Sequence, residues 1–418
     1  MYPAPSMETL LIKGGRVVDP ANGVDGLRDV RIGAGVVEEI GEHLTAREEE
    51  LVIDAGGSIV APGFVDMHVH LREPGYPEKE TIATGTEAAV RGGFTSVACM
   101  PNTKPALDAA ATLEWLREHI AREARCRVYP IAAMTLGRLG LEPCDYEALA
   151  RAGAVAFSDD GDTIGDAPVA LAAAQRGRAV AGVFISHCED PSFPGAAGRP
   201  PMAEDLAVAR DLVIAAATMK NWHVAHLTTR CALDLVRVAR RQGATVTCEV
   251  TPHHLILTSE SARELGAAAR VNPPLREEED CAALREGVRD GTIDAFASDH
   301  APHTSAEKSG TGGNVAPGFS GLEVAVGAYA HALPDLPVSR FVEMLSTNPA
   351  RILGIAGGSL ERGARADITI FAQREWIVDP AAFASKGTST PFAGWRLPRK
   401  VLATIVGGEL RYRAETAA

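Results

Sequence analysis

Between residues 61 and 354, short apolar runs alternate with longer segments rich in Ala, Leu and Arg. This alternation is typical of parallel β-strands joined by helical crossovers. We count about eight predicted strands, as a barrel needs, with cores at residues 64–65, 96–98, 128–129, 155–157, 180–185, 224–225, 246–248 and 295–297. Predicted helices include residues 113–124, 206–219 and 233–241. The pattern predicts an α/β fold, a (β/α)8 TIM-like barrel.

Both ends of the chain carry a different pattern, in which short apolar runs are separated by turn residues. Examples are residues 36–40 near the N-terminus and residues 366–371 and 401–406 near the C-terminus. Such runs read as strands without intervening helices. We therefore predict that residues 1–60 and 355–418 form one small discontinuous β-rich, sandwich-like domain, and that residues 61–354 form the barrel.

Polar side chains follow almost every predicted barrel strand. They are Asp66, His68 and His70 after the first strand, Asn102 after the second, Asp159 and Asp160 after the fourth, His187 after the fifth, His226 after the sixth, His253 and His254 after the seventh, and Asp299, His300 and His303 after the eighth. The carboxyl ends of barrel strands meet at one mouth, where active sites lie. The sequence thus predicts one site built from residues that are far apart in the chain.

The composition of this site favours a metal. His68 and His70 stand two residues apart at a strand end, so both face the same side, and imidazole and carboxylate groups suit zinc or a similar divalent ion. A lone His-x-His pair is weak evidence for a metal site, because such a pair has a structural role about as often as it binds a metal. With His187, His226 and Asp299 at three further strand ends and Asp160 at a fourth, the structural alternative becomes a minority interpretation.

Net charge and cysteine content limit the partners and the cellular compartment that we expect for this protein. The chain has 418 residues, with 41 Lys+Arg against 54 Asp+Glu and a net charge of -13, which disfavours binding to nucleic acid or to an anionic membrane. Its seven cysteines are scattered and form no Cys-x-x-Cys pair. This pattern argues against a disulfide framework and favours a reducing compartment. No long apolar run or export signal is evident, so we expect a cytoplasmic protein.

Seven short motifs resemble the successive signatures of bacterial dihydroorotases in the amidohydrolase superfamily. They are His68-Val69-His70-Leu71-Arg72-Glu73-Pro74-Gly75, Met100-Pro101-Asn102-Thr103, Ala156-Phe157-Ser158-Asp159-Asp160-Gly161, His187-Cys188-Glu189-Asp190, Val250-Thr251-Pro252-His253-His254-Leu255, Asn272-Pro273-Pro274-Leu275-Arg276 and Asp299-His300-Ala301-Pro302-His303. The resemblance spans almost the whole chain.

The resemblance implies two divalent metal ions, with zinc as the expected metal. One ion would be held by His68, His70 and Asp299, the other by His187 and His226, and Asp160 would bridge them. Many relatives bridge with a carboxylated lysine instead, but no lysine lies between Lys104 and Lys220 in this chain. A carboxylate bridge is what remains.

The implied reaction is the reversible cyclisation of N-carbamoyl-L-aspartate to L-dihydroorotate in pyrimidine biosynthesis. Two adjacent cations lower the pKa of a shared water, so a hydroxide is the expected nucleophile at the ring carbonyl. Asp299 is the expected general acid and base, carrying a proton between this nucleophile and the ring nitrogen.

The resemblance also assigns substrate contacts. These are His70, Arg72, Asn102, Asn272, His303, Pro317 and Gly318, of which Arg72, Asn102 and His303 would bind the substrate carboxylate. Asn272 has an alternative interpretation as the opening residue of a turn. The glycine-rich segment 310–321 is a candidate flap over the mouth. Asp159, His253 and His254 are expected to have structural or supporting roles, and Cys188 to pack as a small apolar group.

Two alternatives stay open from the sequence. One is a related cyclic-amide hydrolase, an allantoinase or hydantoinase, against which the missing lysine and the set of Arg72, Asn102 and His303 argue. The other is a non-catalytic dihydroorotase-like subunit of an aspartate transcarbamoylase complex, against which the complete set of ligands argues. Association of an active enzyme with such a transcarbamoylase, and a homodimer, are compatible with the resemblance.

Overall fold

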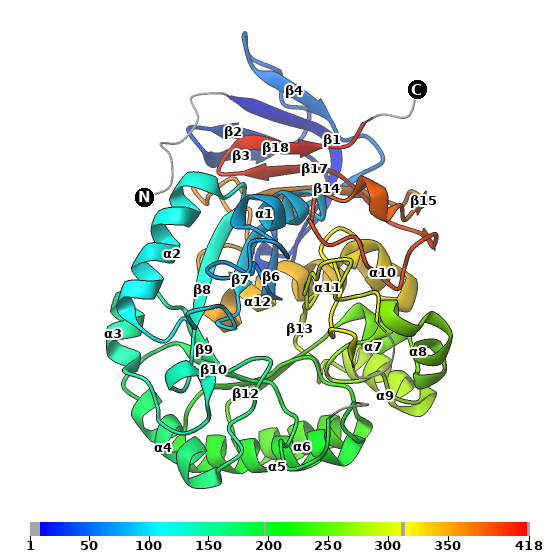
Figure 1. Cartoon of the computed structure of the whole chain (residues 1–418). Coiled ribbons are helices and arrows are strands. Elements are labelled where there is room, and N and C mark those ends of the chain that lie inside the picture. The colour runs from blue at the N-terminus through cyan, green and yellow to red at the C-terminus, as the bar shows by residue number, and fades with distance from the viewer. Residues whose placement is uncertain (1–8, 196–197, 311–313, 416–418) are drawn as a thin grey trace.

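The computed structural model describes residues 9–195, 198–310 and 314–415, and Figure 1 shows a barrel with a separate β-sheet at one end. The outermost residues of the predicted β-rich domain, 1–8 and 416–418, lie outside the described residues. So do residues 311–313 of the candidate flap. Within the described ranges, no helix combines the length and apolar character needed to cross a bilayer.

The barrel contains eight parallel strands in sequence order, which confirms the predicted fold class. They are β6 (Phe64–Val69), β7 (Phe94–Cys99), β8 (Arg127–Ala132), β9 (Ala156–Ser158), β10 (Val183–Ser186), β11 (Trp222–Val224), β12 (Val246–Val250) and β13 (Ala295–Phe296). The first and last strands meet through a bridge between Val69 and His300, where His70 N donates to His300 O at 2.8 Å. This contact nearly closes the barrel.

Helices surround the strands (Figure 1). They are α1 (Ile82–Arg91), α2 (Ala110–Glu123), α3 (Tyr146–Arg151), α4 (Ala167–Gly177), α5 (Pro201–Thr218), α6 (Arg230–Arg241), α7 (Pro252–Ile256), α8 (Ser259–Leu265) and α9 (Glu278–Arg289), followed by α10 (Ala325–Ala332), α11 (Val338–Val342) and α12 (Asn348–Leu353). Shorter helical turns are η1 (Pro20–Asn22), η2 (Leu136–Arg138), η3 (Gly266–Ala269), η5 (Glu343–Thr347) and η6 (Pro380–Ala382). Several helices begin where a side chain caps free backbone N–H groups: Thr81 before α1, Asp166 before α4 and Thr229 before α6.

A β-bulge in β6 aims both histidines of the His-x-His pair. Val65 and Met67 belong to an apolar cluster shared with the other barrel strands, so they face the interior. The pairing of β6 with β7 shifts register between Asp66 and Val69. A bulge changes which residues face each side of a strand. His68 and His70, which follow Met67, can therefore face the interior as well.

The second sheet joins the two ends of the chain, as the sequence pattern predicts. Its strands are β1 (Leu10–Asp19), β2 (Val24–Gly33), β3 (Val36–Gly41), β4 (Leu51–Asp54), β5 (Ile59–Pro62), β14 (Ile368–Ala372), β17 (Lys400–Val406) and β18 (Glu409–Arg413). The junction is the antiparallel pair of β5 and β14, in which Ala61 lies opposite Thr369. Strands β15 (Trp376–Ile377) and β16 (Arg396–Leu397) form a separate small ribbon. The domain boundaries at residues 60 and 355 stay a prediction.

Two local expectations differ from the structure. The fifth barrel strand begins at Val183 rather than at Val180, because Val180 N donates to Gly177 O in a turn that continues from α4. Asp66 and His68 lie within β6 rather than after it, and the carboxylate of Asp66 accepts from Ser298 N at 3.2 Å. Asp66 therefore links the first and last strands of the barrel.

Candidate metal centre

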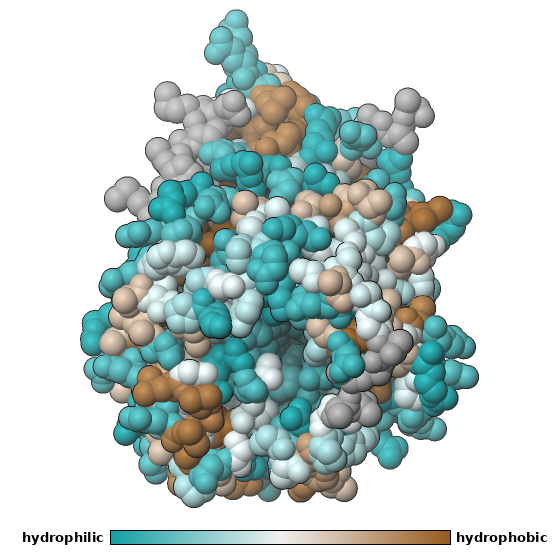
Figure 2. All heavy atoms as spheres, in the orientation of Figure 1, coloured by the Kyte–Doolittle hydropathy of each residue, from teal (hydrophilic) through white to brown (hydrophobic). Residues whose placement is uncertain are grey.

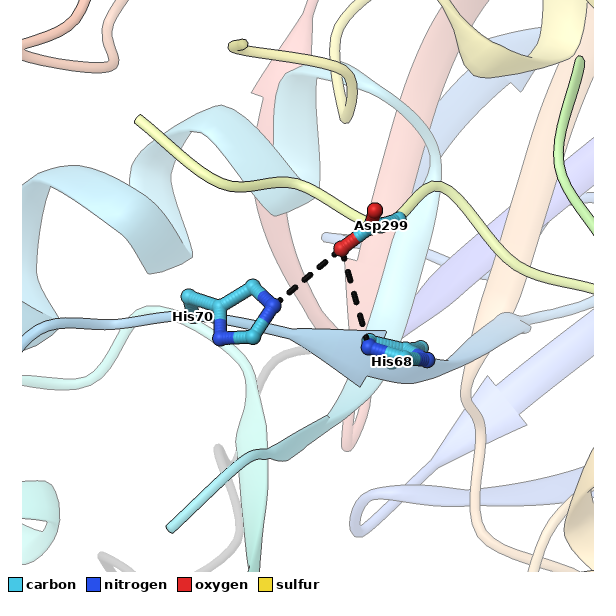
Figure 3. A group of neighbouring side chains, drawn as sticks. All are labelled: His68, His70 and Asp299. Carbon is cyan, nitrogen blue, oxygen red and sulfur yellow. Dashed lines mark hydrogen bonds and ion pairs between the residues drawn. The ribbon is translucent and has the colours of Figure 1, made fainter. Parts of the chain in front are cut away.

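The face in Figure 2 is hollowed near the middle of the barrel, and mainly hydrophilic atoms border the hollow. Figure 3 shows His68, His70 and Asp299 pointing toward one another. His70 Nε2 lies 3.1 Å and His68 Nε2 3.6 Å from Asp299 Oδ1. All three residues are buried, with His68 fully inaccessible. The end of β6 and the segment after β13 thus bring together three side chains that could hold a metal ion.

Asp160, which follows β9, stands between this group and two further histidines. Its Oδ2 lies 3.5 Å from His70 Nε2, and its Oδ1 lies 3.3 Å from His68 Nε2. On the other side, Oδ1 is 3.5 Å from both His187 Nδ1 and His226 Nε2. One carboxylate therefore faces four histidines from three different strand ends, and all six predicted ligands lie in one cluster.

The spacing of the donor atoms fits divalent metal ions. Donors bound at 2.0–2.1 Å to a shared tetrahedral ion lie about 3.3–3.4 Å apart, and the distances above are 3.1–3.6 Å. Asp160 Oδ1 and His68 Nε2 are also buried without a hydrogen-bond partner. Buried polar atoms without partners are costly, and a cation would satisfy both. The residues present therefore fit a metal site.

Three of the four histidines are held in orientation by a hydrogen bond at the ring nitrogen that points away from the cluster. Glu249 Oε1 lies 2.7 Å from His68 Nδ1, and Glu189 Oε2 lies 3.1 Å from His187 Nε2. Asn102 Oδ1 lies 2.8 Å from His70 Nδ1. Because these oxygens accept a hydrogen bond from the ring N–H, the nitrogen that faces the cluster can offer its lone pair to a metal.

Sequence reasoning missed Glu249 and gave Glu189 no role. Glu249 is an acidic residue inside the apolar strand β12, and it also contacts His223 Nε2 at 3.2 Å. A carboxylate buried in a parallel strand must have charged or polar partners. This requirement was the available signal, but it does not identify the partners. Asn102, predicted as a substrate contact, lies where it also orients His70.

The carboxylates of the cluster are ionised despite their burial. Burial raises the pKa of Asp160, but the charge of His68 and the hydrogen bond from His187 hold this pKa well below its ordinary value. Burial also opposes ionisation of Asp299, yet the hydrogen bond from His70 and the charge of His68 hold its pKa below the ordinary value. Protonated histidines supply the balancing positive charge in the metal-free protein, and divalent cations would replace those protons.

Three residues at this site have a strained backbone conformation. Arg72, His226 and Asp299 have φ angles of 63°, 30° and 48°, in the left-handed region that side chains other than glycine rarely adopt. Each such residue costs about 1–3 kcal/mol and persists where surrounding contacts impose it. The strained backbone at these three residues sets the direction of their side chains at the site.

Four of the predicted substrate contacts adjoin one another beside the cluster. Arg72 is buried, its Nε donates to Pro302 O at 3.1 Å, and its Nη2 lies 3.2 Å from His303 Nε2. His303 Nε2 in turn donates to Pro317 O at 2.8 Å, and Gly318 follows.

Asn272 is set apart from this group. It lines a cavity of about 540 Å³ together with Arg263, Arg270 and Val315, and none of the six clustered residues lines this cavity. The structure does not place Asn272 in contact with the cluster.

The residues expected to have supporting roles make structural contacts. Asp159 Oδ1 accepts from Met134 N at 2.8 Å and does not face the cluster. His254 Nε2 donates to Pro273 O at 3.0 Å, and burial lowers the pKa of His253 to about 3. Cys188 is buried within the main apolar cluster.

Comparison with known proteins agrees with this geometry. The family model described as dihydro-orotase-like matches residues 57–232, and the amidohydrolase family model matches residues 204–411. The dihydroorotase of Pelotomaculum thermopropionicum is 46% identical over 96% of this chain and 98% of its own. That of Syntrophus aciditrophicus is 41% identical over 97% of this chain and 100% of its own.

Solved structures of similar fold are more distant in sequence. The L-hydantoinase (dihydropyrimidinase) of Arthrobacter aurescens superimposes with a TM-score of 0.89 at 23% identity, covering 99% of this chain and 98% of its own. A dihydropyrimidinase from Brevibacillus agri gives a TM-score of 0.85 at 22% identity, covering 97% and 95%. These two structures support the fold only.

The barrel, the appended sheet and the buried His–Asp cluster define an enzyme of the amidohydrolase class. Within that class, the identity of more than 40% to dihydroorotases over nearly the full length of the chain determines the family. The chain belongs to the dihydroorotase family.

Proposed function

We propose that this chain is a dihydroorotase that catalyses the reversible cyclisation of N-carbamoyl-L-aspartate to L-dihydroorotate. The observation that carries the proposal is Asp160, an aspartate placed between two groups of histidines where no lysine is available. The curated relatives bearing this name match over nearly their whole length, which supports the same substrate.

We assign one divalent ion to His68, His70 and Asp299 and a second to His187 and His226, with Asp160 shared between them. Zinc is the expected metal, since His and carboxylate donors suit it. Bound there, the two ions would acidify a water and polarise the ring carbonyl of the substrate.

Asp299 is the proposed proton carrier. Its carboxylate is ionised, so it can accept the proton of the nucleophilic hydroxide and deliver that proton to the ring nitrogen as the C–N bond breaks. In the cyclisation direction the Asp299 carboxylate takes the proton from the carbamoyl nitrogen. Because Asp299 contacts His68 and His70, its position is fixed during this exchange.

Arg72 is the proposed anchor of the substrate carboxylate, with Asn102 and His303 beside it. Arg72 forms no ion pair within residues 9–195, 198–310 and 314–415, although its guanidinium is buried. A buried guanidinium without a carboxylate partner is suited to bind one from a ligand. Asn272 and the backbone of Pro317 and Gly318 complete the proposed contacts, and His70 lies close enough to take part.

The test is turnover by the purified chain before chelation, after chelation and after zinc is restored. L-dihydroorotate is the substrate, and hydantoin and allantoin are the controls. We expect metal-dependent hydrolysis of dihydroorotate alone. Turnover of only hydantoin or allantoin would favour the related hydrolases, and no turnover by fully metallated protein would favour a non-catalytic subunit. A cytoplasmic location, a homodimer and an association with aspartate transcarbamoylase belong to the same proposal as predictions.

A further inference from the structure

Lys308 is a buried lysine in the segment that follows β13, with 8% of the residue exposed. Its Nζ donates to three backbone carbonyls: Gly318 O at 2.7 Å, Ala316 O at 3.0 Å and Arg270 O at 3.5 Å. In the described part of the chain no carboxylate pairs with it. Backbone carbonyls therefore hold this buried ammonium.

These carbonyls belong to the two segments that carry the backbone and Asn272 contacts of the proposed substrate site. Ala316 and Gly318 flank Pro317, and Arg270 lies two residues before Asn272. The Arg270 carbonyl also accepts from Gly318 N at 2.9 Å. Lys308 Nζ thus lies at the junction of the two segments.

The segment around Pro317 is tightly fitted against the barrel mouth. Pro317 O accepts from His303 Nε2, which is the neighbour of Arg72. Gly318 has a φ of +119°, and a Cβ at this position would lie 2.6 Å from Ala301 Cβ. With so little space, a shift of the segment would also displace the His303 ring.

We propose that Lys308 is a positioning residue for substrate binding, holding the Pro317–Gly318 segment and the Asn272 segment in one arrangement at the mouth. The proposal rests on the proposed function, because those segments are the substrate contacts assigned above. Lysine suits this place because its Nζ offers three N–H donors from one atom. Without the ammonium, the buried carbonyls would lose their donor, and the segments would rearrange to reach water.

The chain offers a matched control in Lys220, just before β11. This lysine is 4% exposed, and its Nζ also donates to three carbonyls: Gly177 O at 2.8 Å, Val180 O at 2.9 Å and Gly182 O at 2.6 Å. Burial lowers the pKa of both lysines to about 8. Lys220 lies at the opposite end of the strands from the mouth. Its substitution should therefore lower the stability of the protein without changing the substrate site.

The experiment compares Lys308→Met with Lys220→Met, each loaded with zinc. We expect both variants to lose thermal stability to a similar extent and to retain the metal content of the wild type. Only Lys308→Met should raise KM for L-dihydroorotate, by about tenfold or more, with a smaller change in kcat. Lys308→Arg, which keeps the charge and several donors, should restore part of the affinity.

A second measurement does not depend on turnover. Hydrogen exchange of backbone amides in residues 315–320, without substrate, should be about tenfold faster in Lys308→Met and unchanged in Lys220→Met. If the wild type fails to hydrolyse dihydroorotate, the proposed function fails, and this measurement still decides whether Lys308 holds the segment. Unchanged exchange, an unchanged KM in an active enzyme, or an equal KM increase in Lys220→Met would overturn the proposal. If Lys308→Met does not fold, Lys308→Gln replaces it under the same criteria.

Discussion

His68 Nδ1 and Glu249 Oε1 lie 2.7 Å apart in a fully buried contact between the first and seventh barrel strands. Burial raises the pKa of Glu249, but hydrogen bonds from His223 and His68 outweigh it and lower this pKa to about 2. The carboxylate is therefore ionised and accepts a hydrogen bond from the Nδ1–H group of His68. Its role would be to fix the orientation of a metal ligand without touching the metal.

Glu249→Gln should weaken zinc affinity by about 10–100-fold, because a neutral amide oxygen accepts the hydrogen bond from His68 less strongly than a carboxylate and orients the ring less firmly. Competition with a chromophoric chelator measures this directly. Glu50→Gln is the control, since Glu50 is a buried carboxylate paired with Arg31 at 2.9 Å in the other sheet. Equal zinc affinity in the Glu249 variant and the wild type would contradict the prediction.

Asp160→Asn should reduce bound metal from two ions to one or none per chain, because a neutral amide cannot balance two cations. We expect kcat/KM to fall by at least about a hundredfold. Elemental analysis after gel filtration measures the metal content. The adjacent Asp159→Asn should keep both ions, since Asp159 accepts from the backbone at Met134 instead. Two retained ions in the Asp160 variant would exclude the bridging role.

Glu323→Gln should change the pH dependence of folding stability. Burial raises the pKa of Glu323 to about 7, despite hydrogen bonds from Ala384 N and Ser385 N. Between about pH 4.5 and 7 the folded protein retains a proton that the unfolded chain releases, so stability falls as pH rises. The glutamine variant avoids this loss and should be more stable than the wild type by about 1–3 kcal/mol at pH 8.

Urea unfolding at pH 8 and near pH 4.5 tests this prediction, since the advantage of the glutamine variant should vanish at the lower pH. Exposed Glu375→Gln provides the comparison, because its side chain is 64% exposed. An equal difference between variant and wild type at both pH values would show that Glu323 does not titrate as expected.

Gly318→Ala should destabilise the protein and raise KM, because the new methyl group meets Ala301 Cβ at 2.6 Å and Ala301 O at 2.7 Å. Gly363→Ala is the control that has backbone strain but no steric clash. Gly363 also has a positive φ, +86°, but nothing lies within 4 Å of a Cβ at this position. We expect a loss of about 1–2 kcal/mol for Gly363→Ala and a larger loss for Gly318→Ala. Similar melting temperatures for the two variants would show that the segment can move aside.

The barrel and the position of its His–Asp cluster were predictable because both depend on regular features. Parallel strands are apolar runs, and their carboxyl ends converge whatever the loops do, so Asp160 and Asp299 could be placed together from their strand positions alone. The resemblance to a known family then supplied the division of ligands between two ions.

The supporting contacts were not predictable, because they depend on side-chain packing between strands. Nothing local in the sequence pairs Glu249 with His68, and Lys308 resembles any other loop lysine until its three carbonyl partners are seen. Asn272 illustrates the converse. Its motif predicts a substrate contact, but its position depends on loops that the strand pattern does not determine.

The antiparallel pair of β5 and β14 has a consequence for the order in which the chain folds. During synthesis, Ala61 emerges long before its partner Thr369, so β5 can pair with β14 only after nearly the whole barrel has been synthesised. Contacts between residues so distant in sequence are slow to form, because chain entropy must be lost before they stabilise anything. The bridge of Val69 to His300 imposes a similar delay on closing the barrel. Completion of both sheets is therefore a late event, which depends on synthesis of the segment after β13 for the barrel and of β14 for the second sheet.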